Sequence, residues 1–147
     1  MKELRLEALR DAPAAFAMPL SEALARPDER WQVDAERGTG SRHPTFVTEA
    51  DGRLTGMVTA WDMGRDVVEL MQMFVRSEQR GSGVGAALVD AVLVHAREHG
   101  FGRVELGVAA GNTGAERLYA RCGFVRSGER VERPVAGICE LRMALTL

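Results

Sequence analysis

The sequence predicts a mixed α/β fold in which a central β-sheet is flanked by helices. Two runs of alternating polarity, residues 45–49 and 54–61, indicate antiparallel strands, and a longer apolar run follows at residues 67–75. Helical periodicity then covers residues 84–99, and a further strand pattern occupies residues 103–109. A strand, a helix and a strand in this order imply a parallel crossover, so the sheet should contain both parallel and antiparallel pairs.

Length and composition are those of one globular domain, residues 1–147. Hydrophobic residues make up 46% and charged residues 27%, and the formal net charge of −2 gives no basic footprint for nucleic acid. No apolar run approaches the roughly 20 residues that a membrane helix needs. Charges fill the N-terminal segment where a signal peptide is apolar, so we expect a cytoplasmic protein that binds neither nucleic acid nor membrane.

The two cysteines, Cys122 and Cys139, are isolated in the sequence and lack both metal-ligand spacing and a disulfide framework. Reduced thiols in a reducing compartment are the simplest interpretation. The sequence therefore predicts no metal site.

The N-terminal region has a helical pattern. Apolar residues alternate with charges over residues 4–11, and this helix should end before Pro13, because the residue before a proline disfavours helix. Ser21 is a candidate cap for a short second helix, and Pro27 for the first position of a third, which extends to about Glu36.

A β-hairpin follows. The dipeptide Asp51-Gly52 joins the first two strand patterns and is a typical two-residue hairpin turn. The apolar run at residues 67–75 should add a third strand to this meander.

The central feature of the sequence is a glycine-rich turn, Arg80-Gly81-Ser82-Gly83-Val84-Gly85, between that strand and the following helix. The glycines remove side chains where the chain turns, so that backbone N–H groups can converge on an anion at the positive end of the helix. Apolar residues recur at helical spacing from Val84 to Val92, and Gly100 suits the C-terminal cap. We expect this loop to bind a diphosphate.

Two interpretations compete for the glycine-rich turn. The series Gly81, Gly83 and Ala86 fits the dinucleotide fingerprint G-x-G-x-x-G/A, and Glu105 lies near where a ribose-binding acid is sought. A dinucleotide fold, however, normally opens with this turn and needs a long doubly wound sheet, whereas here the turn is central in the chain. Read instead as Arg80-x-x-Gly83-x-Gly85, the turn resembles the pyrophosphate-binding signature of the GNAT superfamily of N-acetyltransferases.

A second motif, residues 112–124, supports the latter interpretation. Thr113 and Glu116 have the spacing of a capping box, and Gly123 suits a left-handed helix end, so the segment should be a short helix that leads into a strand. It also closely resembles the later GNAT motif Asn-x-x-Ala-x-x-Leu-Tyr followed by Gly-Phe. The matching positions are Asn112, Ala115, Leu118, Tyr119, Gly123 and Phe124.

The C-terminal region should supply two closing strands, residues 124–130 and 137–147, of which residues 140–143 resemble a common last strand of the family. The resemblance implies the GNAT acyl-CoA N-acyltransferase fold. GNAT domains usually begin with a strand, whereas the helical pattern here starts almost at Met1. Either that strand is absent or the start is trimmed, and the next strand is then an edge that a partner chain, such as the second copy in a homodimer, can cover.

The resemblance implies a chemistry as well: direct transfer of an acetyl group from acetyl-CoA to a primary amine. In the family, the strand backbone at Met73, Phe74 and Val75 pairs with the pantetheine amides, and the loop from Arg80 through Ala86 holds the diphosphate. Asn112 should contact the pantetheine or only its own turn. The residues expected to bind acetyl-CoA are Met73, Phe74, Val75, Arg80, Gly81, Ser82, Gly83, Val84, Gly85, Ala86, Asn112 and Tyr119.

Two residues are the catalytic candidates. Tyr119 is the expected acid, because a phenol pKa near 10 is close to that of an alkyl thiol. Glu69 is the expected base, directly or through water, since strand alternation should place it beside Met71, Met73 and Val75 in apolar surroundings that raise a carboxyl pKa. A chain of waters alone is the alternative base.

The sequence does not identify the acceptor amine. In GNAT folds the amine site is built from the first helices and from late loops, here residues 1–44 and 128–138, where charges of both signs occur, Arg130 and Arg133 among them. A cationic small molecule, an amino acid and a peptide amine are all compatible. His43 is placed near a substrate entrance, while Trp31 and Trp61 belong either to an acceptor pocket or to the core.

Two other classes of function are compatible with the sequence. A GNAT-like module can bind acyl-CoA without turnover, as a sensor or partner subunit, although the presence of both Glu69 and Tyr119 argues against it. A nicotinamide-dependent oxidoreductase is the remaining alternative.

Overall fold

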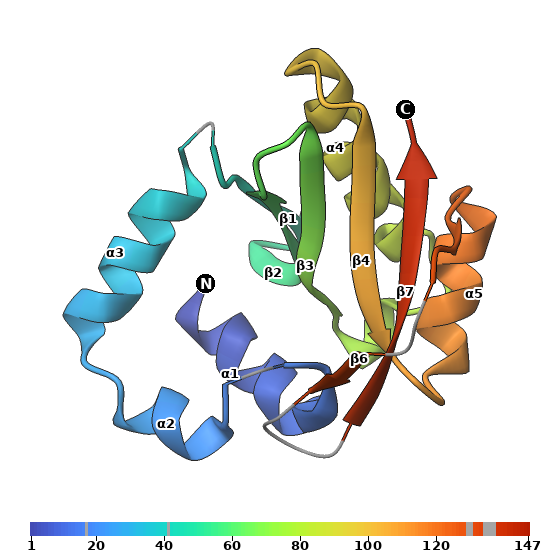
Figure 1. Ribbon diagram of the computed structural model, residues 1–147. Coiled ribbons are helices and arrows are strands. Elements are labelled where there is room, and N and C mark those ends of the chain that lie inside the picture. Colours follow the sequence, from blue (N-terminus) through green and yellow to red (C-terminus); the bar gives the residue numbers. More distant parts are fainter. Residues whose placement is uncertain (17, 41, 129–130, 134–137) are drawn as a thin grey trace.

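A mixed seven-stranded sheet is the centre of the computed structural model, which describes residues 1–16, 18–40, 42–128, 131–133 and 138–147 (Figure 1). The strand order is β1-β2-β3-β4-β7-β5, and β6 pairs with β7. The strands are β1 (Thr45–Ala50), β2 (Arg53–Asp62), β3 (Val67–Val75), β4 (Arg103–Ala109), β5 (Val125–Arg126), β6 (Val131–Arg133) and β7 (Ile138–Thr146).

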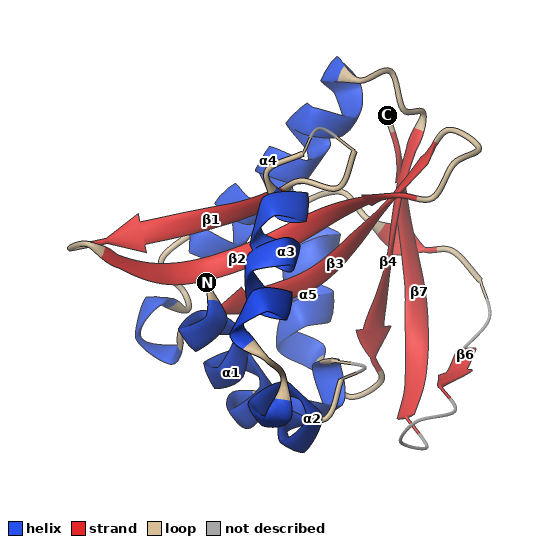
Figure 2. Ribbon diagram, turned by 90° about the vertical axis from the view of Figure 1, so that its left-hand side faces the viewer, coloured by secondary structure: helices blue, strands red, loops and turns tan. Residues whose placement is uncertain are grey.

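Helices flank this sheet. They are α1 (Lys2–Asp11), α2 (Leu20–Ala25), α3 (Asp28–Gly38), α4 (Val84–Glu98) and α5 (Thr113–Arg121), with single 3₁₀ turns η1 (Pro13–Ala15) and η2 (Ser77–Gln79). In Figure 2, α3 crosses in front of β2 and β3 while α4 lies behind the sheet. No helix within the described ranges combines the length and the apolar character needed to cross a bilayer.

The sheet confirms the predicted fold class. Strands β1, β2 and β3 form an antiparallel meander, β3 and β4 are parallel across the α4 connection, and β4 pairs antiparallel with β7. In the described part of the chain, no strand precedes α1, and β1 pairs only with β2, so β1 is an edge strand.

Two apolar clusters hold the layers together. The larger one joins α4 to the sheet through Leu88, Val89, Val92 and Ala96, which are at most 2% exposed and repeat at helical spacing as the sequence predicted. The smaller one lies against the opposite face of the sheet, where Leu4 and Ala8 of α1 pack on Met57 and Phe74. Helix α1 is thereby fixed against the strand that leads to the glycine-rich turn.

Several helix and strand ends differ from expectation. The short helix α2 starts at Leu20 after Pro19, so Ser21 is not its cap, and Pro27 lies one residue before α3 rather than inside it. The predicted strand at residues 124–130 is instead the short β5, with β6 after it. Residues 129–130 and 134–137, including Arg130 and the expected strand start at Gly137, lie outside the described residues.

A β-bulge in β3 overturns the expected strand alternation. Met57 pairs with Phe74 and Thr59 with Met71, so the single residue between Met57 and Thr59 opposes two on β3. Gln72 at this bulge has a φ of 57°, a left-handed conformation. Because one extra residue reverses the faces, side chains on the two sides of the bulge no longer share the alternation that the sequence predicted.

The reversal is visible in the packing. Val68 and Leu70, before the bulge, belong to the α4 cluster, and so do Met73 and Val75 after it. Glu69 therefore does not lie on the same side as Met73 and Val75, and that part of the prediction is wrong. Only Met71 stays with Glu69.

Candidate active site

The parallel strands β3 and β4 separate soon after they pair. Their described pairing covers only residues 67–69 of β3 and 103–105 of β4, and the strands then diverge (Figure 2). A cavity of about 310 Å³ lies in the opening. Its wall includes Met73 of β3, Val108 of β4 and Tyr119 of α5. Backbone groups of β3 beyond Glu69 thus lack β4 as a partner.

The glycine-rich turn lies where β3 gives way to α4. Gly81 and Gly83 have φ values of 76° and 90°, which only glycine adopts without strain, and Gly83 is the N-cap of α4. The first backbone bond of the helix runs from the Ala87 N–H to the Gly83 carbonyl, so the N–H groups of the first turn have no intrahelical acceptor. This geometry is compatible with the anion site that the same glycines predict, and anion binding itself stays a prediction.

Gly85 has a different role. A Cβ at this position would lie 2.9 Å from Leu118 Cδ2, so the missing side chain allows α4 to pack closely on α5. Leu118 also lines the cavity between β3 and β4, so one residue of the cavity wall lies against the glycine-rich turn. Ser82, in the exposed part of the turn, donates a hydrogen bond from Oγ to the Gln79 carbonyl at 2.5 Å.

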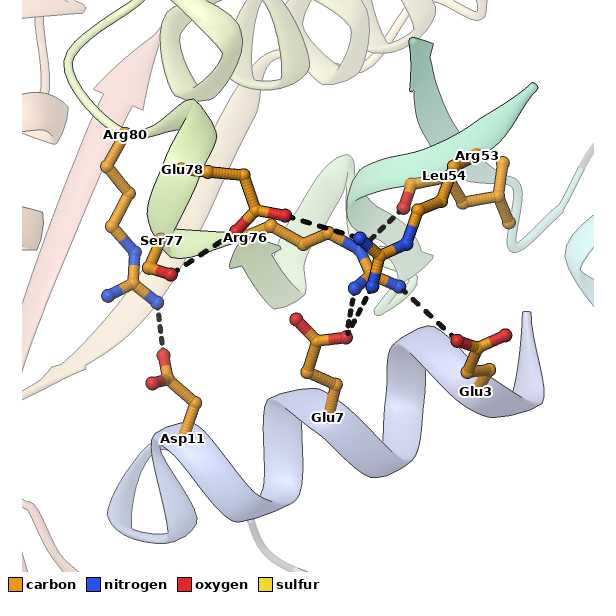
Figure 3. Close-up of polar contacts among 9 residues, drawn as sticks. All are labelled: Glu3, Glu7, Asp11, Arg53, Leu54, Arg76, Ser77, Glu78 and Arg80. Carbon is orange, nitrogen blue, oxygen red and sulfur yellow. Dashed lines mark hydrogen bonds and ion pairs between the residues drawn. The ribbon is translucent and has the colours of Figure 1, made fainter. Parts of the chain in front are cut away.

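Arg80 lies at the turn as expected, but its guanidinium already has partners (Figure 3). Nε donates to the Val75 carbonyl at 2.9 Å, and Nη2 is paired with Asp11 at the end of α1. The side chain is half exposed, so it can also reach an anion at the turn.

The contacts of Arg76 were not predicted from the sequence. Its side chain is 2% exposed, its Nε donates to the Leu54 carbonyl at 2.8 Å, and its Nη1 is paired with Glu7 of α1 (Figure 3). Glu3 lies at the outer limit of an ion pair, 4.0 Å from Nη2. Because Glu3, Glu7 and Asp11 follow one another at helical spacing, one face of α1 is attached to the segment between β3 and the glycine-rich turn.

Glu69 lies at the point where β3 and β4 part. Its Oε1 accepts a hydrogen bond from Arg142 Nη1 of β7 at 2.8 Å, and Glu105 Oε2 lies 3.5 Å from the other arginine nitrogen. Burial opposes the charge of Arg142, but Glu69 and Glu105 together raise its pKa above the ordinary value. Glu69 thus lies in an ion-pair network and not in the wholly apolar surroundings that the sequence suggested.

A second cavity, of about 630 Å³, lies between the N-terminal helices and the sheet. His43, Trp31 and Trp61 all line it, and the rings of His43 and Trp61 stack with centroids 3.9 Å apart. Neither tryptophan is part of the buried core, so the pocket alternative describes their position.

The two cavities share a wall. The residues that line both are Arg5, Met18, Glu69, Met71 and Gln72. The bulge of β3 at Gln72 and the carboxylate of Glu69 therefore lie between a site beside Tyr119 and a site beside the tryptophans. Two compounds, one in each cavity, would meet at this wall.

Tyr119 is 5% exposed, and its ring lies edge-on to Phe124 with centroids 6.0 Å apart. Burial raises the pKa of the phenol above its usual range, with a smaller contribution from Cys122. The phenol therefore stays protonated across the physiological range and is available as a donor on the wall of the first cavity. Its pKa does not, however, stay close to that of an alkyl thiol, as the sequence argument assumed.

Asn112 lines the same cavity and also caps α5. Its Oδ1 accepts a hydrogen bond from the Ala115 N–H at 3.2 Å, and it is the N-cap residue. The predicted capping box is therefore wrong: Thr113 is the first residue inside the helix, and Glu116 is paired with Arg126 instead.

Three residues of this region escaped the sequence interpretation: Arg5, Gln72 and Arg142. Arg142 carried a signal, because charges at 140 and 142 alternate with apolar residues at 141 and 143 in the last strand. Gln72 carried a weaker one, as the uncharged polar residue inside the apolar run at 67–75. Arg5 lies beside the buried stripe of α1, and nothing local indicates its surroundings.

A family profile and curated relatives both identify this chain as similar to N-acetyltransferases. The profile described as the Acetyltransferase (GNAT) family matches residues 6–124. N-acetyltransferase 8F1 of Mus musculus is 32% identical over 106 residues, which are 67% of this chain and 48% of that protein. The chain spans about half the length of the curated relatives it matches.

Solved structures agree in fold. The crystal structure of nourseothricin acetyltransferase is 33% identical, with a TM-score of 0.66 over 71% of this chain and 65% of that one. A putative acetyltransferase from Salmonella typhimurium, solved with its cofactor acetyl-CoA, is 21% identical, with a TM-score of 0.73 over 99% of this chain and 85% of that one. At this lower identity, the second likeness concerns the fold alone.

Proposed function

The chain belongs to the GNAT acetyltransferase family, and from this premise we propose that it transfers the acetyl group of acetyl-CoA to a primary amine. The observation that carries the proposal is the wall shared by two cavities. One cavity is lined by Tyr119 and by Leu118, which lies against Gly85 of the glycine-rich turn. The other cavity adjoins the N-terminal helices, and Glu69 lines both. Direct transfer between two bound substrates needs such an arrangement.

The donor site in this proposal runs from the glycine-rich turn into the opening between β3 and β4. The first-turn N–H groups of α4 bind the diphosphate, with Arg80 as an additional cation. The pantetheine binds along the edge of β3 that does not pair with β4. The proposed contacts are Met73, Phe74, Val75, Arg80, Gly81, Ser82, Gly83, Val84, Gly85, Ala86, Asn112 and Tyr119. The Salmonella structure with acetyl-CoA supports a donor of this kind for the fold.

The acceptor site is the larger cavity. Its amine approaches the thioester across the wall formed by Glu69, Met71 and Gln72. Glu69 accepts the proton of the amine, directly or through water, so that the neutral nitrogen can attack. Arg142 holds the carboxylate through Oε1 and leaves Oε2 outside that contact.

Bond changes then balance in a single exchange. A carbon–nitrogen bond forms at the acetyl carbonyl, and the carbon–sulfur bond breaks. Tyr119 donates its proton to the departing sulfur, which leaves as a thiol. The nitrogen loses its second proton as the amide forms, and this proton restores the neutral Tyr119 hydroxyl. Because burial raises the pKa of the phenol, Tyr119 is a weaker acid than an ordinary tyrosine, and its proton transfers only as negative charge develops on sulfur.

The test begins with ligand binding. A ligand at about 100 times its dissociation constant adds roughly 2.7 kcal/mol of stability, which raises the melting temperature by several degrees at this chain length. We expect this shift with acetyl-CoA and coenzyme A but not with NAD, followed by amine-dependent release of free thiol. A shift with NAD alone would contradict the proposal. A shift with acetyl-CoA but no turnover over a broad panel of amines would instead support a non-catalytic module.

A further inference from the structure

The wall between the two cavities contains a cation that has no ion pair among the described residues. Arg5 of α1 lines both cavities, and its Nη1 is buried without a hydrogen-bond partner among the described residues. The described ion pairs do not include Arg5 either. The contact found for its guanidinium is the face of Phe16, whose ring centroid lies 4.9 Å from Cζ.

Such a charge is costly in a folded protein. Burial lowers the pKa of Arg5 to about 10, which still leaves it charged at neutral pH. Asp34 opposes this shift by its charge, but its carboxylate is paired with Arg26 at 2.9 Å. A partly buried cation whose Nη1 lacks a partner destabilises the fold, so its presence at a cavity wall indicates a ligand of opposite charge.

A second unsatisfied donor belongs to the same cavity. Trp31 Nε1 is buried without an acceptor in the described structure, and the guanidinium of Arg26 covers its ring at 5.4 Å. Two other buried nitrogens lack a hydrogen bond, Arg76 Nη1 and Arg103 Nε, but each is within ion-pair distance of a carboxylate. The donors left without either kind of partner, Arg5 and Trp31, thus both lie on the larger cavity.

We propose that the acceptor amine also carries a carboxylate, which Arg5 binds in the larger cavity while the amine faces Glu69. This inference rests on the proposed function and specifies its substrate as an amino acid or a short peptide. Carboxylate oxygens are acceptors, so they satisfy a guanidinium and an indole N–H, and the fork of an arginine matches them in geometry. The stacked rings of His43 and Trp61 offer an apolar surface for the remainder.

A polycationic acceptor fits less well. A polyamine would bring further positive charge to a wall where Arg5 has no ion-paired carboxylate among the described residues, and like charges at short range repel. It would also leave both unsatisfied donors without an acceptor.

The experiment compares amines with and without the carboxylate: phenylalanine against phenethylamine, and leucine against 3-methylbutylamine, with rates expressed per free amine. For the native chain we expect kcat/KM to favour each amino acid by about 10-fold or more, mostly through KM, as for a hydrogen bond to a charged group. Arg5→Met should abolish the preference and Arg5→Lys should retain part of it. Arg10→Met, an exposed arginine of the same helix, should leave it intact.

Stability distinguishes a binding role from a structural one. If Arg5 serves a ligand, the melting temperature of ligand-free Arg5→Met stays the same or rises, because an uncompensated buried charge is removed. A clear fall would show that Arg5 holds α1 in place and would overturn the inference. Equal use of the paired amines, or a preference that survives Arg5→Met, would overturn it as well.

A binding measurement separates this inference from the proposed function. With coenzyme A present, N-acetylphenylalanine or N-acetylleucine should raise the melting temperature of the native chain but not of Arg5→Met, and the corresponding acetylated amines should raise neither. If acetyl-CoA binds while neither acid has an effect, the carboxylate inference fails and the proposed function stands. If the acids bind through Arg5 while acetyl-CoA does not bind, the proposed function fails and the carboxylate site stands.

Discussion

Arg76 and Glu7 form an ion pair that joins the end of β3 to helix α1 (Figure 3). Arg76 is 2% exposed and Glu7 is one-third exposed, so the pair lies largely out of water. The same arginine donates to the Leu54 carbonyl of β2. Three elements that surround the candidate active site are thus tied together by one side chain.

Loss of the Glu7 carboxylate should destabilise the protein. Glu7→Gln removes the countercharge of Arg76, and we expect the free energy of unfolding to fall by about 2–3 kcal/mol, below the full cost of a wholly buried pair because Glu7 is partly exposed. Glu3→Gln, on the same helix face but 83% exposed and 4.0 Å away, should change it by less than about 0.5 kcal/mol. Denaturant unfolding measures both, and equal effects would contradict the role given to Glu7.

Replacement of the proposed base should reduce turnover. Glu69→Gln should lower kcat by about 100-fold, the lower range for a general base, while the melting shift with acetyl-CoA is retained. Glu105→Gln is the matched control, because Glu105 also contacts Arg142 but lines neither cavity. Similar losses in both variants would assign the effect to Arg142 rather than to proton transfer.

The hydroxyl of Tyr119 is tested by Tyr119→Phe. We expect kcat to fall by about 100-fold with little change in acetyl-CoA binding, since the ring keeps its packing. The raised pKa adds a pH prediction: the phenol keeps its proton over a wider range, so Tyr119 should cause no alkaline loss of kcat below about pH 10. Unchanged turnover in the phenylalanine variant would remove Tyr119 from the mechanism.

Acid should weaken the fold through His95. This side chain is 8% exposed beside Phe46, and burial lowers its pKa below the ordinary 6.5, with His99 as a further cause. The unfolded chain then binds the proton more readily, so the contribution of His95 is complete above about pH 6.5 and is lost as the pH falls. Melting temperatures at pH 8 and pH 5 should differ less for His95→Gln than for the native chain. Equal differences would exclude His95 as a source.

Much of the fold was predictable because its signals are local. The hairpin at Asp51-Gly52, the stripe of α4 and the glycines of the turn each depend on neighbouring residues, and the structure has all three. Glycine is required at positions 81 and 83 because the backbone there has a positive φ. The position of Tyr119 on a cavity wall was likewise reached through the motif at residues 112–124.

The tertiary structure decided what surrounds those elements. Glu69 meets Arg142 across 73 positions, and Arg80 meets Asp11 across 69, distances over which local periodicity carries no information. The bulge at Gln72 arises from pairing with β2 and reverses the faces of Met73 and Val75. By itself, the sequence determined the order of most strands and helices and the backbone conformation of the glycine-rich turn, because backbone conformation and hydrophobic periodicity are encoded over a few residues. The shared cavity wall, the burial of Arg76 and the unpaired charge of Arg5 depend on which distant segments meet, and only the packed fold decides that.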